Sequence, residues 1–69
     1  MDQTFSISGE YIELIKLLKA SGLCSTGGQT KMLVEDEKIM VDGKIETRKR
    51  MKLRQGMVVQ YDSHSIKLL

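Results

Sequence analysis

Apolar residues near the start of the chain recur with the spacing of an amphipathic helix. Four of them stand at i, i+3, i+4 and i+7 and would share one helix face; they are Tyr11, Leu14, Ile15 and Leu18. Ser8 is a favourable N-cap ahead of them. The pattern predicts a helix that begins after Ser8 and ends at Gly22, a residue that readily adopts the left-handed conformation that stops a helix.

A second helix is predicted to begin at Thr26. Thr26 and Gln29 have the spacing of a capping box, in which each residue satisfies a backbone N–H near the other. Thr30, Leu33 and Val34 then form a narrow inward face. This helix is expected to end in the acidic residues 35–37.

The remaining apolar segments indicate short strands. Residues 4–7 alternate polar and apolar side chains, as a half-buried strand does. Residues 39–41 are continuously apolar, and the Asp42-Gly43 pair that follows is a two-residue hairpin signal. Further strands are expected at residues 58–61 and 66–68.

These elements predict an α+β fold in which two helices pack on a small, mostly antiparallel sheet. Residues 1–69 are expected to form a single domain, because so short a chain does not divide into two. The predicted core consists of Phe5, Leu14, Ile15, Leu18, Leu33, Val34, Ile39, Val41, Val59 and Ile66.

The composition argues against several classes of site. One cysteine, Cys24, and one histidine, His64, are too few for a zinc site of three or four ligands. No pair of acids lies among apolar residues, where a raised pKa would be expected. We therefore expect no catalytic residues, no metal and no cofactor.

The same sequence gives an expectation for location. No apolar run approaches the length of about 18 residues that a membrane span needs. Residues 1–10 lack the basic start and the apolar stretch of a signal peptide. A single thiol fits a reducing compartment. We expect a cytoplasmic monomer with no membrane partner.

The formal net charge of +2 conceals an uneven distribution. Residues 38–54 hold seven basic residues and only two acidic ones, Asp42 and Glu46. A concentrated basic segment suits a polyanionic partner. The alternative interpretation is that the basic segment is an ordinary solvated face with no partner.

A second feature suits an anion. The predicted helix start at Thr26 would present free backbone N–H groups and the positive end of the helix dipole. Gly27 and Gly28 remove side chains there, so that a phosphate can approach closely, and Lys31 lies one turn further along. The alternative for the two glycines is a flexible helix entry.

These residues resemble a known family, the S-four RNA-binding domain, which is named after the fourth protein of the small ribosomal subunit. The family pattern has a capped helix, an aliphatic residue, Val-x-Val, a turn of Asn-Gly type, a lysine and later a Leu-x-x-Gly turn. In this chain the pattern falls on Thr26, Val34, Ile39, Val41, Asp42-Gly43, Lys44 and Leu53 to Gly56. The resemblance covers roughly residues 11–60 and is closest to the small stand-alone bacterial members.

The chain departs from the family pattern at three positions. Gly27 stands where the family usually has arginine, Glu37 where it often has glycine, and Met57 where it often has aspartate. The basic residues 48–52 can supply the charge that Gly27 lacks.

The resemblance implies non-catalytic binding of ribosomal RNA or tRNA, and through them a link to the ribosomal particle or translation. Phe5, Tyr11 and Tyr61 each fit an apolar stripe, which leaves no stacking platform for single-stranded bases. The partner is then structured RNA, read by shape and phosphate. The predicted contacts are Thr26, Gly27, Gly28, Gln29, Lys31, Lys44, Arg48, Lys49, Arg50 and Lys52.

Two other readings compete with RNA binding. A ubiquitin-like sulfur carrier has a similar length and a similar turn, but its chemistry needs a C-terminal Gly-Gly tail, and this sequence ends Lys67-Leu68-Leu69. A protein-interaction module that uses its apolar strands is the third reading.

Overall fold

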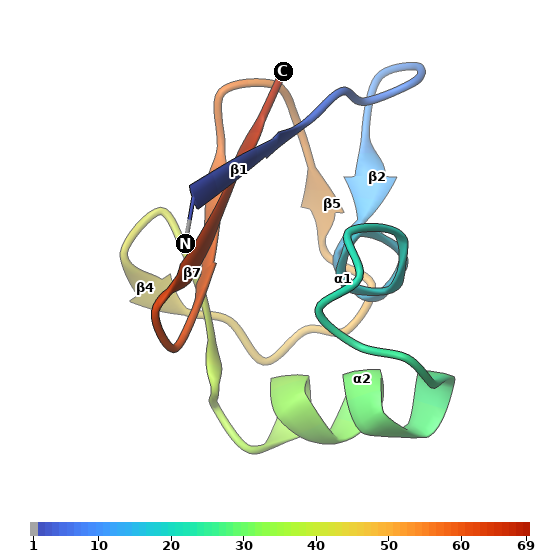
Figure 1. The fold of residues 1–69 in the computed structure, drawn as a ribbon, viewed down its shortest axis with the longest axis vertical. Coiled ribbons are helices and arrows are strands. Elements are labelled where there is room, and N and C mark those ends of the chain that lie inside the picture. The colour runs from blue at the N-terminus through green and yellow to red at the C-terminus, as the bar shows by residue number, and fades with distance from the viewer. Residues whose placement is uncertain (1) are drawn as a thin grey trace.

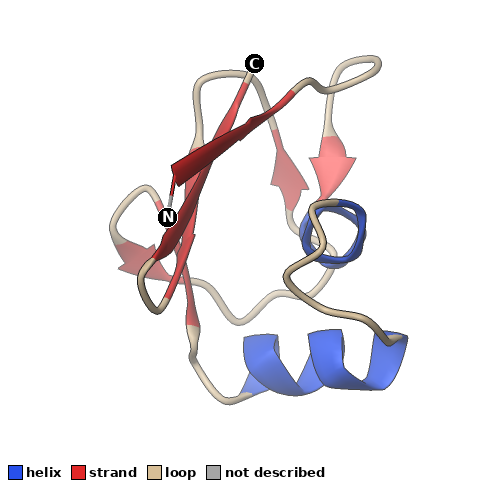
Figure 2. Cartoon of the chain, in the orientation of Figure 1, coloured by secondary structure: helices blue, strands red, loops and turns tan. Residues whose placement is uncertain are grey.

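A computed structural model describes residues 2–69 of the chain. Within them the structure has two helices and seven strands, coloured by type in Figure 2. The helices are α1 (Leu14–Ala20) and α2 (Gly27–Glu35). The strands are β1 (Asp2–Phe5), β2 (Ile12–Glu13), β3 (Ile39–Val41), β4 (Lys44–Ile45), β5 (Lys52–Leu53), β6 (Val58–Tyr61) and β7 (His64–Leu68).

Five of the strands form one sheet in the order β1-β7-β6-β3-β4. β1 and β7 run parallel, and every other neighbouring pair in this sheet is antiparallel. The helices lie to one side of the sheet, and in Figure 1 α1 is seen nearly end-on while α2 lies lengthwise. The predicted α+β fold with a mostly antiparallel sheet is confirmed.

The hairpin predicted at Asp42-Gly43 joins β3 to β4. Asp42 has φ 52° and Gly43 has φ 86°, the positive values that a tight two-residue hairpin requires. The Asp42 side chain also accepts a hydrogen bond of 3.0 Å from the backbone N–H of Val58. The turn is therefore tied to the next strand of the sheet.

The predicted start of the first helix is wrong. The helix begins at Leu14 rather than after Ser8, because the residues before it serve as a strand. Ile12 pairs with Leu53 in the antiparallel ribbon of β2 and β5. A backbone that is paired with a distant strand cannot also make helical hydrogen bonds, so this long-range pairing overrides the local helical pattern.

The second helix begins as predicted. The Thr26 side chain accepts a hydrogen bond of 3.1 Å from the backbone N–H of Gln29. The reciprocal contact is displaced by one residue, since Gln29 Oε1 accepts from Ser25, from its backbone N–H at 3.3 Å and its hydroxyl at 3.2 Å. The chain leaves the helix through Glu37, which has a left-handed φ of 60°.

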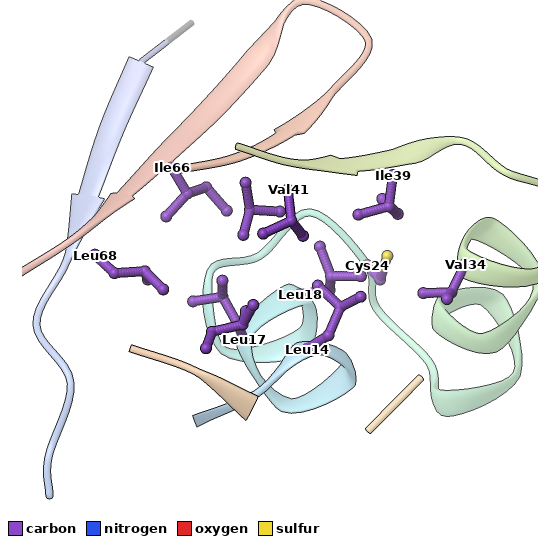
Figure 3. Close-up of a cluster of buried hydrophobic side chains, with 11 residues drawn as sticks. Leu14, Leu17, Leu18, Cys24, Val34, Ile39, Val41, Ile66 and Leu68 are labelled. Atoms are coloured by element: carbon purple, nitrogen blue, oxygen red, sulfur yellow. The ribbon is translucent and has the colours of Figure 1, made fainter. Parts of the chain in front are cut away.

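The core lies between the five-stranded sheet and α1 (Figure 3). Leu14, Leu17 and Leu18 of α1 are completely buried there. Three residues predicted for the core, Phe5, Ile15 and Leu33, are only partly buried and pack against it from outside. The buried set is Leu14, Leu17, Leu18, Cys24, Val34, Ile39, Val41, Leu53, Val59, Ile66 and Leu68.

Candidate nucleic-acid interface

The segment of residues 46–52, here called the basic loop, leads from β4 into β5. Its backbone is attached to the start of α1. The N–H of Leu14 donates to the carbonyl of Met51 at 2.9 Å, and the N–H of Ile15 donates to the carbonyl of Lys49 at 3.1 Å. Glu13 makes no side-chain cap at this helix start, so the loop carbonyls satisfy the free N–H groups instead.

The cations of the basic loop point to solvent from this fixed backbone. The side chains of Arg48 and Arg50 are 73% and 80% exposed, and that of Lys49 is 40% exposed. Arg48, Arg50, Met51 and Lys52 line an open hollow of about 490 Å³. Exposed guanidinium and ammonium groups around a hollow suit an anionic ligand.

Each of the three consecutive cations is already paired with a carboxylate, and each carboxylate comes from a different part of the chain. The pairs are Arg48 with Glu46 at 2.8 Å, Lys49 with Glu35 at 2.6 Å and Arg50 with Glu13 at 3.0 Å. Glu13 is shared, since Lys16 lies 3.7 Å from its other oxygen. The loop therefore carries less unbalanced positive charge than its sequence suggests.

The pairs displace the pKa values of the carboxyl groups in the expected direction. The hydrogen bond from Arg50 lowers the pKa of Glu13, and the hydrogen bond from Lys49 lowers that of Glu35. The Arg48 side chain likewise lowers the pKa of Glu46. All three carboxylates are thus ionised at neutral pH, and a bound anion would have to replace them.

The start of α2 is the second part of the predicted site. A Cβ built on Gly27 or on Gly28 meets no atom within 4 Å, so neither glycine is required by packing. The Gln29 side-chain oxygen already accepts hydrogen bonds from Ser25, while Lys31 is exposed on the next turn. The helix start is open on its outer side.

The two parts of the predicted site meet α2 at opposite ends. Lys49 pairs with Glu35, the last residue of α2, whereas the glycines are its first residues. At about 1.5 Å of rise per residue, those ends are roughly 12 Å apart along the helix axis. Lys44 belongs to neither part, since it lies on β4, the edge strand of the five-stranded sheet (Figure 1). The basic loop gathers Arg48, Lys49, Arg50 and Lys52, and the other predicted contacts stand apart from it.

Sequence reasoning misplaced one residue beside the loop. Tyr11 was expected in an apolar helix stripe, yet the residue is 40% exposed. The Lys52 ammonium lies over its ring, 5.0 Å from the ring centroid. The error follows from the wrong helix start, because Tyr11 precedes strand β2 instead of facing the core.

Other kinds of site find little support in the described residues. Residues 2–69 contain no group of three or more His, Cys, Asp or Glu side chains placed to hold a metal ion. Cys24 is a buried free thiol, as expected for a small apolar core residue. Within the same range, no helix has the length and apolar character needed to cross a membrane.

Comparison with known proteins settles the family. A family model described as "S4 domain" matches residues 5–69. The chain belongs to the S4 domain family. The match extends beyond the residues 11–60 on which the sequence resemblance rests, and it includes the whole of β7 and the last residue of β1, Phe5.

This S4 domain has curated relatives of its own size. It is 37% identical over 67 residues to "Putative RNA-binding protein YbcJ" of Escherichia coli (strain K12), a match that covers 96% of each chain. The "Uncharacterized protein YbcJ" of Shigella flexneri matches with the same identity and coverage. The solution structure of Escherichia coli YbcJ, described as revealing an ALFAL motif involved in RNA-binding, has a TM-score of 0.75 to this S4 domain. That comparison covers 96% of this chain and 85% of the solved one.

Proposed function

We propose that this S4 domain binds structured RNA without catalysing a reaction, and that the basic loop is its main contact. The observation that carries the proposal is the display of three consecutive exposed cations on a backbone that is hydrogen-bonded to the start of α1. The printed descriptions of the relatives, which associate YbcJ with RNA binding, support the same conclusion.

Binding would proceed by exchange of partners. The carboxylates of Glu13, Glu35 and Glu46 hold the cations in the absence of RNA. The cation of each pair is exposed, and water and salt weaken such pairs. The Glu35 side chain is 55% exposed, so a phosphate can displace it at small cost, whereas the side chains of Glu13 and Glu46 are only 16% and 12% exposed and lose more when their cation turns to RNA. The phosphate meets a cation whose conformational freedom is already restricted. Arg48 and Arg50 can each donate two hydrogen bonds to one phosphate.

The finer features of the proposal rest on the family resemblance. We propose an RNA of the ribosomal or transfer class, a link to the ribosomal particle or translation, and a cytoplasmic monomer. The proposed contact set adds the start of α2 and the exposed lysines to the loop. It consists of Thr26, Gly27, Gly28, Gln29, Lys31, Lys44, Arg48, Lys49, Arg50 and Lys52.

The test is an RNA titration at several salt concentrations on the variant Arg48→Ala, Lys49→Ala, Arg50→Ala. If about four loop cations meet phosphates, the logarithm of the association constant should fall with the logarithm of salt concentration with a slope of about −3 to −4. The triple variant should bind more weakly, and its slope should be flatter by about three units. A melting curve recorded alongside shows that the variant is folded.

The matched control is the variant Lys19→Ala, Lys38→Ala, Lys67→Ala. It removes the same net charge from exposed side chains outside the loop. The control should keep most of the slope. Equal weakening by both variants would indicate a general charge effect, and unchanged binding by the folded loop variant would identify the loop as a solvated face.

A further inference from the structure

Tyr11 combines features that packing does not require. Its ring is exposed, and it has Lys52 over it at 5.0 Å. Tyr11 also helps to line a hollow of about 330 Å³, together with Ile12, Glu13, Lys16 and Arg50. This volume lies near the lower end of the range for small-ligand sites, of about 300 to 1,000 Å³.

The neighbourhood of the ring is held in place by the fold. Directly after Tyr11, Ile12 and Glu13 pair with Leu53 and Lys52 in the β2–β5 ribbon, and Leu53 is completely buried. Tyr11 thus directly precedes an ordered two-stranded ribbon, which also contains Lys52, the end of the basic loop. A side chain anchored in this way loses little further freedom when it binds a ligand.

The charges around the ring have the arrangement that one nucleotide needs. Arg50 lines this hollow and also the hollow of the basic loop. Arg50 and Lys16 both contact the Glu13 carboxylate, at 3.0 Å and 3.7 Å. Lys52 lies over one face of the ring, so a base can stack on the other face while the exposed cations hold the phosphates on either side of the base.

We infer that Tyr11 stacks on a single unpaired nucleobase, whose neighbouring phosphates bind Arg50, Lys52 and Lys16. The inference rests on the proposed RNA binding and narrows its substrate class. A fully paired helix keeps its base faces covered, so the preferred partner is a structured RNA whose helix is interrupted by an unpaired nucleotide. One exposed ring at this place serves one base, which fits a bulge better than a long single strand.

The experiment compares two hairpin RNAs that differ only by one bulged adenosine. The unmodified protein should bind the bulged hairpin more tightly, by about five-fold to one-hundred-fold, which is the effect expected for one base stacked on an aromatic ring. Tyr11→Ala should abolish that preference and leave the affinity for the fully paired hairpin unchanged. Tyr11→Phe should retain the preference, because stacking needs the ring and not the hydroxyl.

Met32→Ala is the matched control, since it truncates another exposed large side chain, on the outer side of α2. It should leave both affinities unchanged. A second readout does not depend on any variant folding. With 2-aminopurine in place of the bulged adenosine, its fluorescence should be quenched when the unmodified protein binds.

The outcomes separate the inference from the proposed function. Equal affinity for the two hairpins, or equal weakening of both by Tyr11→Ala, would overturn the inference and leave RNA binding by the loop intact. A bulged 2-aminopurine whose fluorescence does not change on binding would overturn it as well. Failure to bind either hairpin at low salt would overturn the proposed function together with the inference.

Discussion

Replacing Gly28 with alanine should raise the stability of the protein and lower its affinity for RNA. Gly28 is exposed in the first turn of α2, its φ is not left-handed, and an added Cβ meets nothing within 4 Å. Alanine can therefore adopt the same conformation without strain. It also restricts the unfolded chain more than glycine does, which shifts the equilibrium toward the folded state.

The expected gain in the free energy of unfolding is about 0.5–1 kcal/mol, since glycine is less favourable than alanine in a helix by roughly this amount. In a domain of this size, a change of about 1 kcal/mol moves the melting temperature by about 4–8 °C. Thr26→Ala, in contrast, should lower the free energy of unfolding through the same helix. It removes the hydrogen bond accepted from Gln29, and a lost N-cap of this kind costs about 1 kcal/mol.

The effect of Gly28→Ala on RNA binding follows from a different property of the same site. If a phosphate lies against the N–H groups of α2, the new methyl group holds it further away. A charge at a helix start gains about 0.3–1 kcal/mol from the dipole, so the affinity should fall by about two-fold to five-fold. The slope of affinity against salt should stay the same, because no cation is lost.

The assays are a melting curve and an RNA titration on one preparation of the variant. A lower melting temperature would refute the reasoning about the open space at Gly28. A stabilised variant with unchanged affinity would show that the start of α2 makes no phosphate contact, and that its glycines act only as a helix entry.

Three further predictions concern stability. Leu53→Ala removes a completely buried side chain from β5 and should lower the free energy of unfolding by about 2–5 kcal/mol in urea titrations; a loss under about 1 kcal/mol would contradict its place in the core. Glu37→Gly should stabilise the protein by about 1 kcal/mol in the same assay, because Glu37 holds a φ of 60° that glycine adopts without strain; a destabilised variant would rule this out. The pKa values of Glu13, Glu35 and Glu46 are lowered from 4.5 in the folded state, so their contribution to stability is present above that pH and is lost as the pH falls through their folded values. Urea midpoints recorded from about pH 7 to about pH 3 should therefore decline below about pH 4.5, and replacing all three with glutamine should reduce that decline.

The features that the sequence predicted correctly depend on neighbouring residues. The capped start of α2 depends on Thr26 and Gln29, which are three positions apart, and the β3–β4 hairpin depends on Asp42-Gly43 alone. Local chemistry of this kind can be read without knowing the rest of the fold.

The features that the sequence could not predict depend on distant residues. The apolar spacing around Tyr11 and Ile12 suits a helix, but β5 pairs with this segment and makes it a strand. The contact between Arg50 and Glu13 joins residues that are 37 positions apart. Counting charges along the chain therefore overestimated the free positive charge of the basic loop. The exposure of Tyr11 was not predicted, because the predicted helix included this residue.

The pairing of β1 with β7 has a consequence for how the chain acquires its structure. Asp2 lies beside Ser65 and Phe5 beside Leu68, so during synthesis β1 leaves the ribosome well before β7, the strand that it pairs with. A contact over so many residues forms slowly, because a long loop must close before any hydrogen bond is gained. During synthesis, β1 and the apolar faces of α1 are left without the strand that covers them. We therefore expect the nascent chain to be most prone to aggregation just before β7 emerges. A truncation that removes β1 and exposes the edge of β7 should lower the yield of folded protein.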